Sequence, residues 1–374
     1  MSGGEMKPFN ISEPPGPPVS EAPHFLVIPD IETIFKAMTS INLLLASFGI
    51  LTNSINIAVF ARGRITDTST SVTLFALSLA DLSFVVFIFI WTSIRELSYM
   101  DIRFGVPKQV LTFYVSALSL LSYTLSSFLT VFLAVQKCCC VVFPLQVKDM
   151  FTLRRTVLIL LTLSILTTTF YMLLLTAGKF LPRVNPKTNT SEMALVSSPR
   201  QLEIIQVVIN ISQNVAPSLS LIIVILCFVV LVHRLKQSSR FRHRSEMGYT
   251  KDSSDSKSTT TTTTTTSTRH HTDLPHHQLS GKDLQAAQSV AVVAAMFVVC
   301  NIPPVMMTYA SLVEPEFNDY RRLWSLYALS GIGRTTLQIL CCSLNLVVYV
   351  RYNATYRRGL AELCWVVKVT SKRP

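Results

Sequence analysis

The chain contains 374 residues, of which 49% are hydrophobic and 14% are charged, and its formal net charge is +12 at pH 7. The charged residues are grouped between long uncharged stretches, which argues against a soluble protein, where charges mark every exposed face. Nucleic-acid binding is a poor explanation of the positive charge, because the basic residues do not form a folded domain of their own.

Uncharged or nearly uncharged segments of at least 23 residues occur seven times along the chain. About 20 apolar residues are enough to cross the hydrocarbon core of a bilayer. The repetition therefore predicts an all-α membrane protein with seven transmembrane helices rather than a soluble all-α protein. The predicted spans cover residues 37–61, 68–94, 109–136, 156–178, 204–233, 284–313 and 323–350.

Lysine and arginine are concentrated in the connections after the first, third and fifth spans and in the segment after the seventh. Because basic residues are retained on the cytoplasmic side, this pattern predicts an external N-terminus and a cytoplasmic C-terminus. The positive charge would then face the anionic lipids of the plasma membrane. The eight cysteines lie in the spans or on the inner face, so we expect no extracellular disulfide.

On this topology residues 1–36 form an extracellular tail, residues 37–364 the seven-helix domain and residues 365–374 a cytoplasmic tail. Asn10 and Asn189 begin sequons on the outer face, and we expect both to be glycosylated. The cytoplasmic loop 234–283 contains eight consecutive threonines, which are followed by four histidines, His270, His271, His276 and His277. Such a polar, low-complexity segment predicts disorder, and we interpret its histidines as part of a solvated linker rather than a metal site.

Several spans carry polar residues or prolines that a purely structural membrane helix would not need. Asn53 lies in the first span and Asp81 in the second, where a carboxylate at mid-membrane is costly and requires partners or an ion. The sixth span contains FVVCNIPP, whose adjacent prolines are expected to break the helix. The seventh span ends in NLVVYVRYNATYRRG, where Asn345 and Tyr349 precede a short amphipathic basic segment, residues 353–364.

In combination these residues resemble the rhodopsin-like (class A) family of G-protein-coupled receptors. The matches are Asn53 and Asp81 in the first two helices, Pro217 in the fifth, Phe297, Cys300 and Pro303 in the F-x-x-C-W-x-P of the sixth, and Asn345 and Tyr349 in the N-P-x-x-Y of the seventh. The resemblance covers residues 40 to about 364 apart from the long cytoplasmic loop. It implies a bundle with a short amphipathic eighth helix, and a receptor that passes the binding of an extracellular ligand to a heterotrimeric G protein.

The segment AVQKCCCVVFPLQVKD, residues 134–149, matches the inner end of the third helix in this family. Gln136, Lys137 and Cys138 align with the D-R-Y motif. Adjacent residues of a helix point about 100° apart, so the three cysteines cannot converge on one metal ion. Lys137 keeps the positive charge that the family uses to contact the G protein, whereas Gln136 lacks the acid of the usual ion pair. We therefore expect either raised ligand-free activity or a different interaction that stabilises the inactive state.

Other positions depart from the family pattern. The sixth-helix tryptophan is Asn301, the seventh-helix proline is Leu346, and Thr112 replaces the cysteine of the usual external disulfide. These changes leave open a non-signalling scaffold or decoy receptor with the same fold. A transporter or channel is a weaker alternative, because no inverted repeat is evident. No paired carboxylates or nucleophile constellation indicates an enzyme.

The resemblance also implies a sodium pocket formed by Asp81, Ser126 and Asn345, whose oxygen-bearing side chains suit a hard cation. The alternative is an Asp81 that is protonated or hydrogen-bonded to water. No other cofactor is expected.

The resemblance further implies how the receptor would switch. Helix six would pivot about Pro303 and open a crevice for the G protein. The residues expected to act in this switch and in coupling are Gln136, Lys137, Cys138, Phe297, Asn301, Pro303 and Tyr349.

The ligand is expected between the outer halves of the helices. Ser119 occupies the position of the aspartate in amine receptors, so we do not expect a monoamine. Arg334, the one basic residue inside a span, suits an anionic or peptide ligand with the help of Arg95. Alternatively, Arg334 reaches the headgroups or pairs with Glu203 or Glu314.

Short local similarity suggests a subfamily. KCCCVVFPLQVK and GILTNSINIAVF resemble molluscan chemosensory-type receptors, and are similar to worm chemoreceptors and peptide-amide receptors. At the end of the eighth helix, Cys364 is a candidate for palmitoylation, with a buried free thiol as the alternative.

Overall fold

The computed structural model describes residues 30–62, 68–99, 107–143, 146–184, 191–196, 198–252, 281–318 and 321–370. The predicted glycosylation sites Asn10 and Asn189, and the threonine tract, lie outside the described residues.

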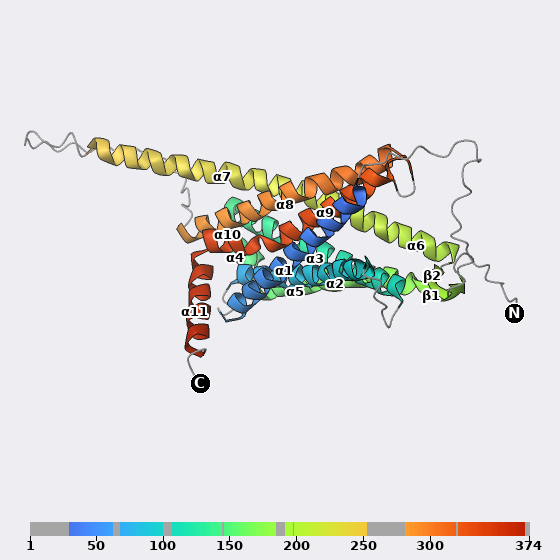
Figure 1. Cartoon of the computed structure of the whole chain (residues 1–374). Coiled ribbons are helices and arrows are strands. Elements are labelled where there is room, and N and C mark those ends of the chain that lie inside the picture. The colour runs from blue at the N-terminus through green and yellow to red at the C-terminus, as the bar shows by residue number, and fades with distance from the viewer. Residues whose placement is uncertain are drawn as a thin grey trace, which may run out of the picture.

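Seven helical segments of the described chain are long and apolar enough to cross a membrane. They are α1 (Ile31–Arg62), α2 (Ser69–Tyr99), α3 (Lys108–Val142), α5 (Leu153–Ala177), the continuous run of α6 (Pro199–Asn210), η2 (Ile211–Val215) and α7 (Ala216–Asp252), then α8 (Gly281–Val313), and α9 (Trp324–Ser343) with α10 (Asn345–Tyr352). They pack side by side into one elongated bundle (Figure 1). The predicted seven-helix bundle is confirmed.

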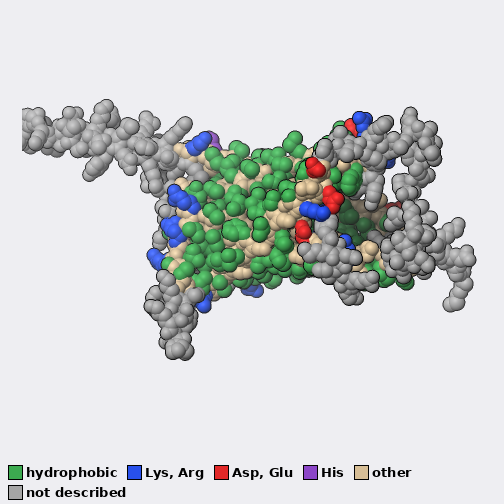
Figure 2. All heavy atoms as spheres, in the orientation of Figure 1, with side chains coloured by type: hydrophobic (Ala, Val, Ile, Leu, Met, Phe, Trp, Pro, Cys, Tyr) green, Lys and Arg blue, Asp and Glu red, His purple; other side chains and the backbone are tan. Residues whose placement is uncertain are grey.

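The surface of the bundle matches a lipid environment. Figure 2 shows hydrophobic side chains covering the middle of the visible face, with Lys and Arg gathered at the end where α10 and α11 (Ala354–Thr370) lie. Large apolar side chains such as Leu158, Ile165 and Leu226 are more than 60% exposed, which water would disfavour and acyl chains would not.

Two expectations are wrong. The fifth span ends close to the predicted residue 233, at Arg234, but the expected disordered loop does not begin there, because α7 continues to Asp252 through a segment of Lys, Arg, Glu and Ser residues without proline. Only the later part of the expected disordered loop, residues 253–280, lies outside the described residues. The sixth span is not broken by its prolines either, since α8 runs continuously through Pro303 and Pro304. Transmembrane helices tolerate proline because local adjustments and neighbouring side chains satisfy the freed carbonyls.

A two-stranded hairpin that the sequence did not predict follows α5. Strand β1 (Lys179–Val184) pairs antiparallel with β2 (Ser191–Val196), with Lys179 opposite Val196. The Phe180 ring lies edge-on to Phe113 of α3 at a centroid distance of 5.6 Å. This aromatic contact attaches the hairpin to α3 where the family pattern would place a disulfide.

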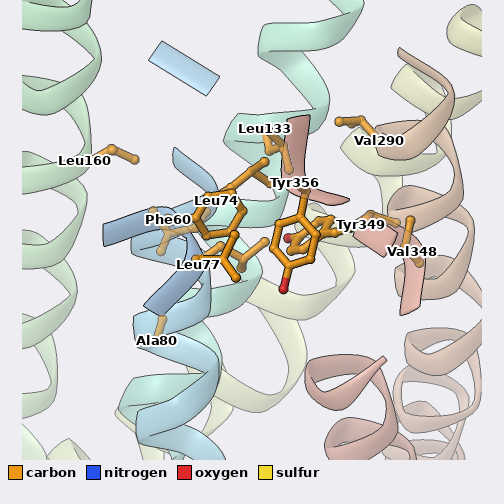
Figure 3. Close-up of a cluster of buried hydrophobic side chains, with 13 residues drawn as sticks. Phe60, Leu74, Leu77, Ala80, Leu133, Leu160, Val290, Val348, Tyr349 and Tyr356 are labelled. Carbon is orange, nitrogen blue, oxygen red and sulfur yellow. The ribbon is translucent and has the colours of Figure 1, made fainter. Parts of the chain in front are cut away.

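The helix after the seventh span, α11, is longer than the predicted segment and packs against α1. The hydroxyl of Tyr356 donates to Asn56 Oδ1 at 2.6 Å. Gly359 permits the close approach, because a Cβ there would stand 3.1 Å from Val59 Cγ1. Figure 3 shows Tyr356 beside Tyr349 and Phe60 in the largest apolar cluster at this end of the bundle.

Candidate functional site

The predicted sodium-pocket residues meet in the interior of the bundle. Asp81 of α2 is 1% exposed, so its carboxylate depends on protein partners. Ser126 of α3 donates its hydroxyl to one carboxylate oxygen, and Asn345 Nδ2 of α10 donates to the other at 2.8 Å. Three helices are therefore joined through one buried carboxylate.

This arrangement depends on a break in the seventh span. Thr52 Oγ1 donates to the Ser343 carbonyl at 3.1 Å, and Asn53 Nδ2 donates to the Cys342 carbonyl at 3.0 Å. In an unbroken helix those carbonyls would accept from backbone N–H groups four residues later. Since side chains of α1 take their place, the break between α9 and α10 persists although Leu346 replaces the family's proline.

The chemistry of this site suits a sodium ion. Carboxylate and hydroxyl oxygens are the ligands that hard cations prefer, and Asp81 and Ser126 supply both types in contact with one another. The same groups also satisfy each other by hydrogen bonding. Both of the alternatives drawn from the sequence are compatible with this geometry, and the sodium ion stays a prediction.

A cavity of about 640 Å³ lies between the helices toward the end of the bundle opposite α11. Its walls combine aromatic and polar side chains from α1, α2, α3, α6, η2 and α9. They include Phe35, Asn42, Phe84, Trp91, Arg95, Ser119, Tyr123, Gln213, Trp324, Arg334 and Gln338. Among these described lining residues the charged ones are both arginines, and none is an acid.

Arg334 does not pair with either of the acids that the sequence suggested. Its Nη1 donates to Gln213 Oε1 at 2.8 Å. Gln213 is presented by the π-helical turn η2, where Ala216 N–H bonds to the carbonyl of Ile211. Pro217 has no N–H to offer the carbonyl of Gln213, and a π turn is a usual response to such a defect. Gln213 was not among the predicted site residues, and Pro217, four residues later, was the signal in the sequence that could have indicated it.

Arg95 and Ser119 also line the cavity, and each already contacts another residue of its own helix. The Arg95 guanidinium lies over the Trp91 ring, 5.0 Å from its centroid. The Ser119 hydroxyl donates to the Ser116 carbonyl at 2.8 Å, so its proton is already used. Arg95 therefore offers a positive charge held against an aromatic face, whereas Ser119 offers chiefly an acceptor.

Asn301 connects the inner side of the cavity to α8. Its Nδ2 donates to the Phe297 carbonyl at 2.8 Å, and its Oδ1 accepts from the Tyr123 hydroxyl at 2.6 Å. Tyr123 lines the cavity, and Asn301 is 2% exposed. Tyr123, a cavity-lining residue of α3, is thus bonded to α8 at the position of the family's tryptophan. Tyr123 was not among the predicted site residues, because it matches none of the family motifs found in the sequence.

The inner end of α3 is held against the first turn of α2. Gln136 Nε2 donates to Ser69 Oγ at 3.0 Å, and Lys137 Nζ donates to Thr70 Oγ1 at 2.6 Å. Lys137 is only 9% exposed. In this arrangement the lysine points to α2 rather than standing free for a partner protein. Cys138 is partly buried and, like every described cysteine, is a free thiol.

These features can be compared with known proteins. The family profile described as "7 transmembrane receptor (rhodopsin family)" matches residues 52–344, which is most of the chain. The chain belongs to this family. It is therefore a multi-pass membrane receptor, and membership indicates a signalling role without enzymatic chemistry. A comparison with curated proteins gave no match.

The remaining predicted residues of this rhodopsin-family receptor occupy the interior. Phe297 is buried among Val224 and other apolar residues of the inner half, and Pro303 lies within α8. The Tyr349 ring lies edge-on to Phe60 at 5.8 Å, and its hydroxyl has no hydrogen-bond partner among the described residues. Cys364 on α11 is exposed, so the alternative of a buried thiol is wrong.

Proposed function

We propose that this receptor binds an extracellular ligand carrying an anionic group and drives guanine-nucleotide exchange on a heterotrimeric G protein at the plasma membrane. The observation that supports this proposal is the sign of the charge in the cavity. Arg334 and Arg95 line it, and the described lining contains no acid that would neutralise them. A cation held within a membrane span calls for a partner of opposite charge.

The chemistry of the walls narrows the ligand class. Trp91, Trp324 and Phe84 offer aromatic surface to an apolar body, while Arg334 offers a planar set of donors to a carboxylate. We infer an amphipathic acid, either a chemosensory cue or a peptide with an acidic or free carboxyl group. Ser119, with its hydroxyl proton committed to the backbone, gives no ion pair to a monoamine.

The signal would pass from the cavity to α8 through Tyr123. A ligand that prefers one arrangement of the bundle shifts the equilibrium toward it. Because Tyr123 lines the cavity and bonds Asn301, displacement of its hydroxyl would release α8 from α3. Movement of α8 about Pro303 would then open the inner end near Lys137 and Tyr349. Asp81 and Ser126 would hold a sodium ion that stabilises the inactive arrangement by neutralising the buried carboxylate.

The experiment is a ligand screen of the full-length receptor with a promiscuous G-protein reporter, followed by potency measurements on variants. Arg334→Ala should lower the potency of an active acid by about tenfold or more, the magnitude of one lost charged hydrogen bond. Arg322→Ala is the matched control, because Arg322 is exposed and does not line the cavity. Unchanged potency in Arg334→Ala would remove the anionic-ligand proposal.

A non-signalling decoy is the second candidate. The observation that favours it is the engagement of Lys137 with Thr70, which withdraws the family's coupling charge from the inner surface. Nucleotide exchange in membranes separates the two candidates, since a decoy binds ligand without stimulating exchange on any G protein. Attachment of a palmitoyl group to the exposed Cys364 is a further proposal, which metabolic labelling of Cys364→Ser would test.

A further inference from the structure

A second, much smaller cavity of about 40 Å³ adjoins the ligand cavity on the side toward Asn301. The two cavities share Leu120, Tyr123, Gln213, Arg334 and Gln338. A volume of this size exceeds the roughly 10–15 Å³ that one water molecule requires, but is far too small for an amphipathic ligand. It has room for one small ion and its immediate hydration. We call it the lower chamber.

The donors that face the lower chamber come from three side chains. Arg334 and Gln338 are four residues apart on α9, so they share one face of that helix. Gln213 approaches from η2 and bonds to Arg334 through its oxygen, which leaves its NH₂ group for another acceptor. The bond to Gln213 uses one of the five N–H groups of the guanidinium.

Several of the other polar residues around the lower chamber already donate a hydrogen bond elsewhere. Ser212 donates to the Val208 carbonyl at 2.7 Å, and Thr308 donates to the Pro304 carbonyl at 3.0 Å. Asn301 donates to the Phe297 carbonyl. The chamber is therefore lined by unused donors of Arg334, Gln213 and Gln338, with no acid among its described lining residues.

The charge balance at this point is incomplete. The partner of Arg334 is a neutral amide, and the carboxylate of Asp81 is already bonded by Ser126 and Asn345. A charge in the low-dielectric interior of a bundle is costly unless it is paired with an opposite charge. The structure thus combines a cation that no acid compensates among the described lining residues, converging amide donors and a space of ionic size.

We propose that a monovalent anion, chloride in the ligand-free receptor, binds in the lower chamber against Arg334 and the amides of Gln213 and Gln338. This site goes beyond the proposed signalling function, because it needs neither a ligand nor a G protein. Chloride and a ligand carboxylate have the same chemistry here, because each brings a single negative charge to the guanidinium of Arg334. The carboxylate of a ligand entering from the larger cavity uses the same charge and displaces the chloride.

The test is the thermal unfolding midpoint of the purified full-length receptor, without ligand or G protein, in mixtures of sodium chloride and sodium gluconate. Sodium and ionic strength stay constant, so any cation at Asp81 is unaffected. Chloride and bromide should raise the midpoint by several degrees in a saturable manner, whereas gluconate is too large to enter. Arg334→Gln should abolish the shift, and Arg95→Gln, which changes the larger cavity alone, should retain it.

A second variant covers the case in which Arg334→Gln fails to fold. Gln338→Leu keeps the charge and removes one amide donor, so the chloride concentration for a half-maximal shift should rise about tenfold. Equal midpoints in chloride and gluconate would refute the site. Stabilisation by acetate but not chloride would also refute it, and would assign the chamber to ligand carboxylates. Neither result bears on nucleotide exchange, which tests the signalling function separately.

Discussion

Removal of the Tyr123 hydroxyl is the sharpest test of how the cavity is connected to α8. Tyr123→Phe deletes the donor that bonds Asn301 Oδ1 at 2.6 Å and changes no apolar contact of the ring. Leaving a buried acceptor without its donor costs about 1–3 kcal/mol. Under the proposed two-state scheme α8 moves away from α3 on activation, so the bond stabilises the inactive arrangement alone. Its loss should raise the ligand-free ratio of active to inactive receptor about 5- to 150-fold.

The assay is ligand-free guanine-nucleotide exchange in membranes, with receptor amounts matched between variants. Thr124→Val is the control, because it deletes the neighbouring buried bond to the Tyr171 hydroxyl, 2.7 Å long, which joins α3 to α5 instead. Asn301→Ala should reproduce the effect of Tyr123→Phe, and the double variant should add little to either alone. If basal exchange in Tyr123→Phe equals that of the wild type, or if Thr124→Val raises it equally, the reasoning fails.

Three other outcomes are expected. Gln136→Asp places the family's acid next to Lys137 and should lower ligand-free exchange severalfold. An unchanged rate would show that the neutral bond from Gln136 to Ser69 already holds the inner end of α3 in the inactive arrangement. Asp81→Asn removes the carboxylate and should abolish any effect of sodium concentration on agonist affinity, and a persisting sodium effect would place the ion elsewhere. Tyr356→Phe loses the bond to Asn56 and should lower the free energy of unfolding by about 1 kcal/mol. A thermal midpoint equal to that of the wild type would show that apolar packing alone attaches α11.

Much of the fold could be predicted because span length is fixed by the bilayer. The seven spans follow from composition, and their helices differ from the prediction mainly at the ends, where no membrane constrains the chain. The extension of α7 to Asp252 depends on helix propensity in a polar segment, which the low-complexity threonines nearby obscured. Hairpin β1–β2 depends on contacts such as Phe180 with Phe113, which link residues far apart in sequence.

The candidate site, like the fold, could be predicted from the sequence only in part. Asp81, Ser126 and Asn345 could be grouped from the sequence because each matches a family motif, and the structure brings them together. The partner of Arg334 could not be found in this way. Acids are the obvious partners for an arginine, but the π turn before Pro217 changes which residue of the fifth span faces inward. A shift of one residue turns a helix face by about 100°, and periodicity alone does not reveal it.

The positions that depart from the family pattern also bear on whether this receptor still has a working switch. Asn301 Oδ1 accepts from the Tyr123 hydroxyl and Gln136 Nε2 donates to Ser69 Oγ, whereas the buried Gln136 Oε1 has no hydrogen-bond partner among the described residues. Polar residues introduced at random into a transmembrane bundle would leave costly unsatisfied groups. The bond between Tyr123 and Asn301 therefore argues that α3 and α8 are held in a defined arrangement, which under the proposed function a ligand in the cavity would release.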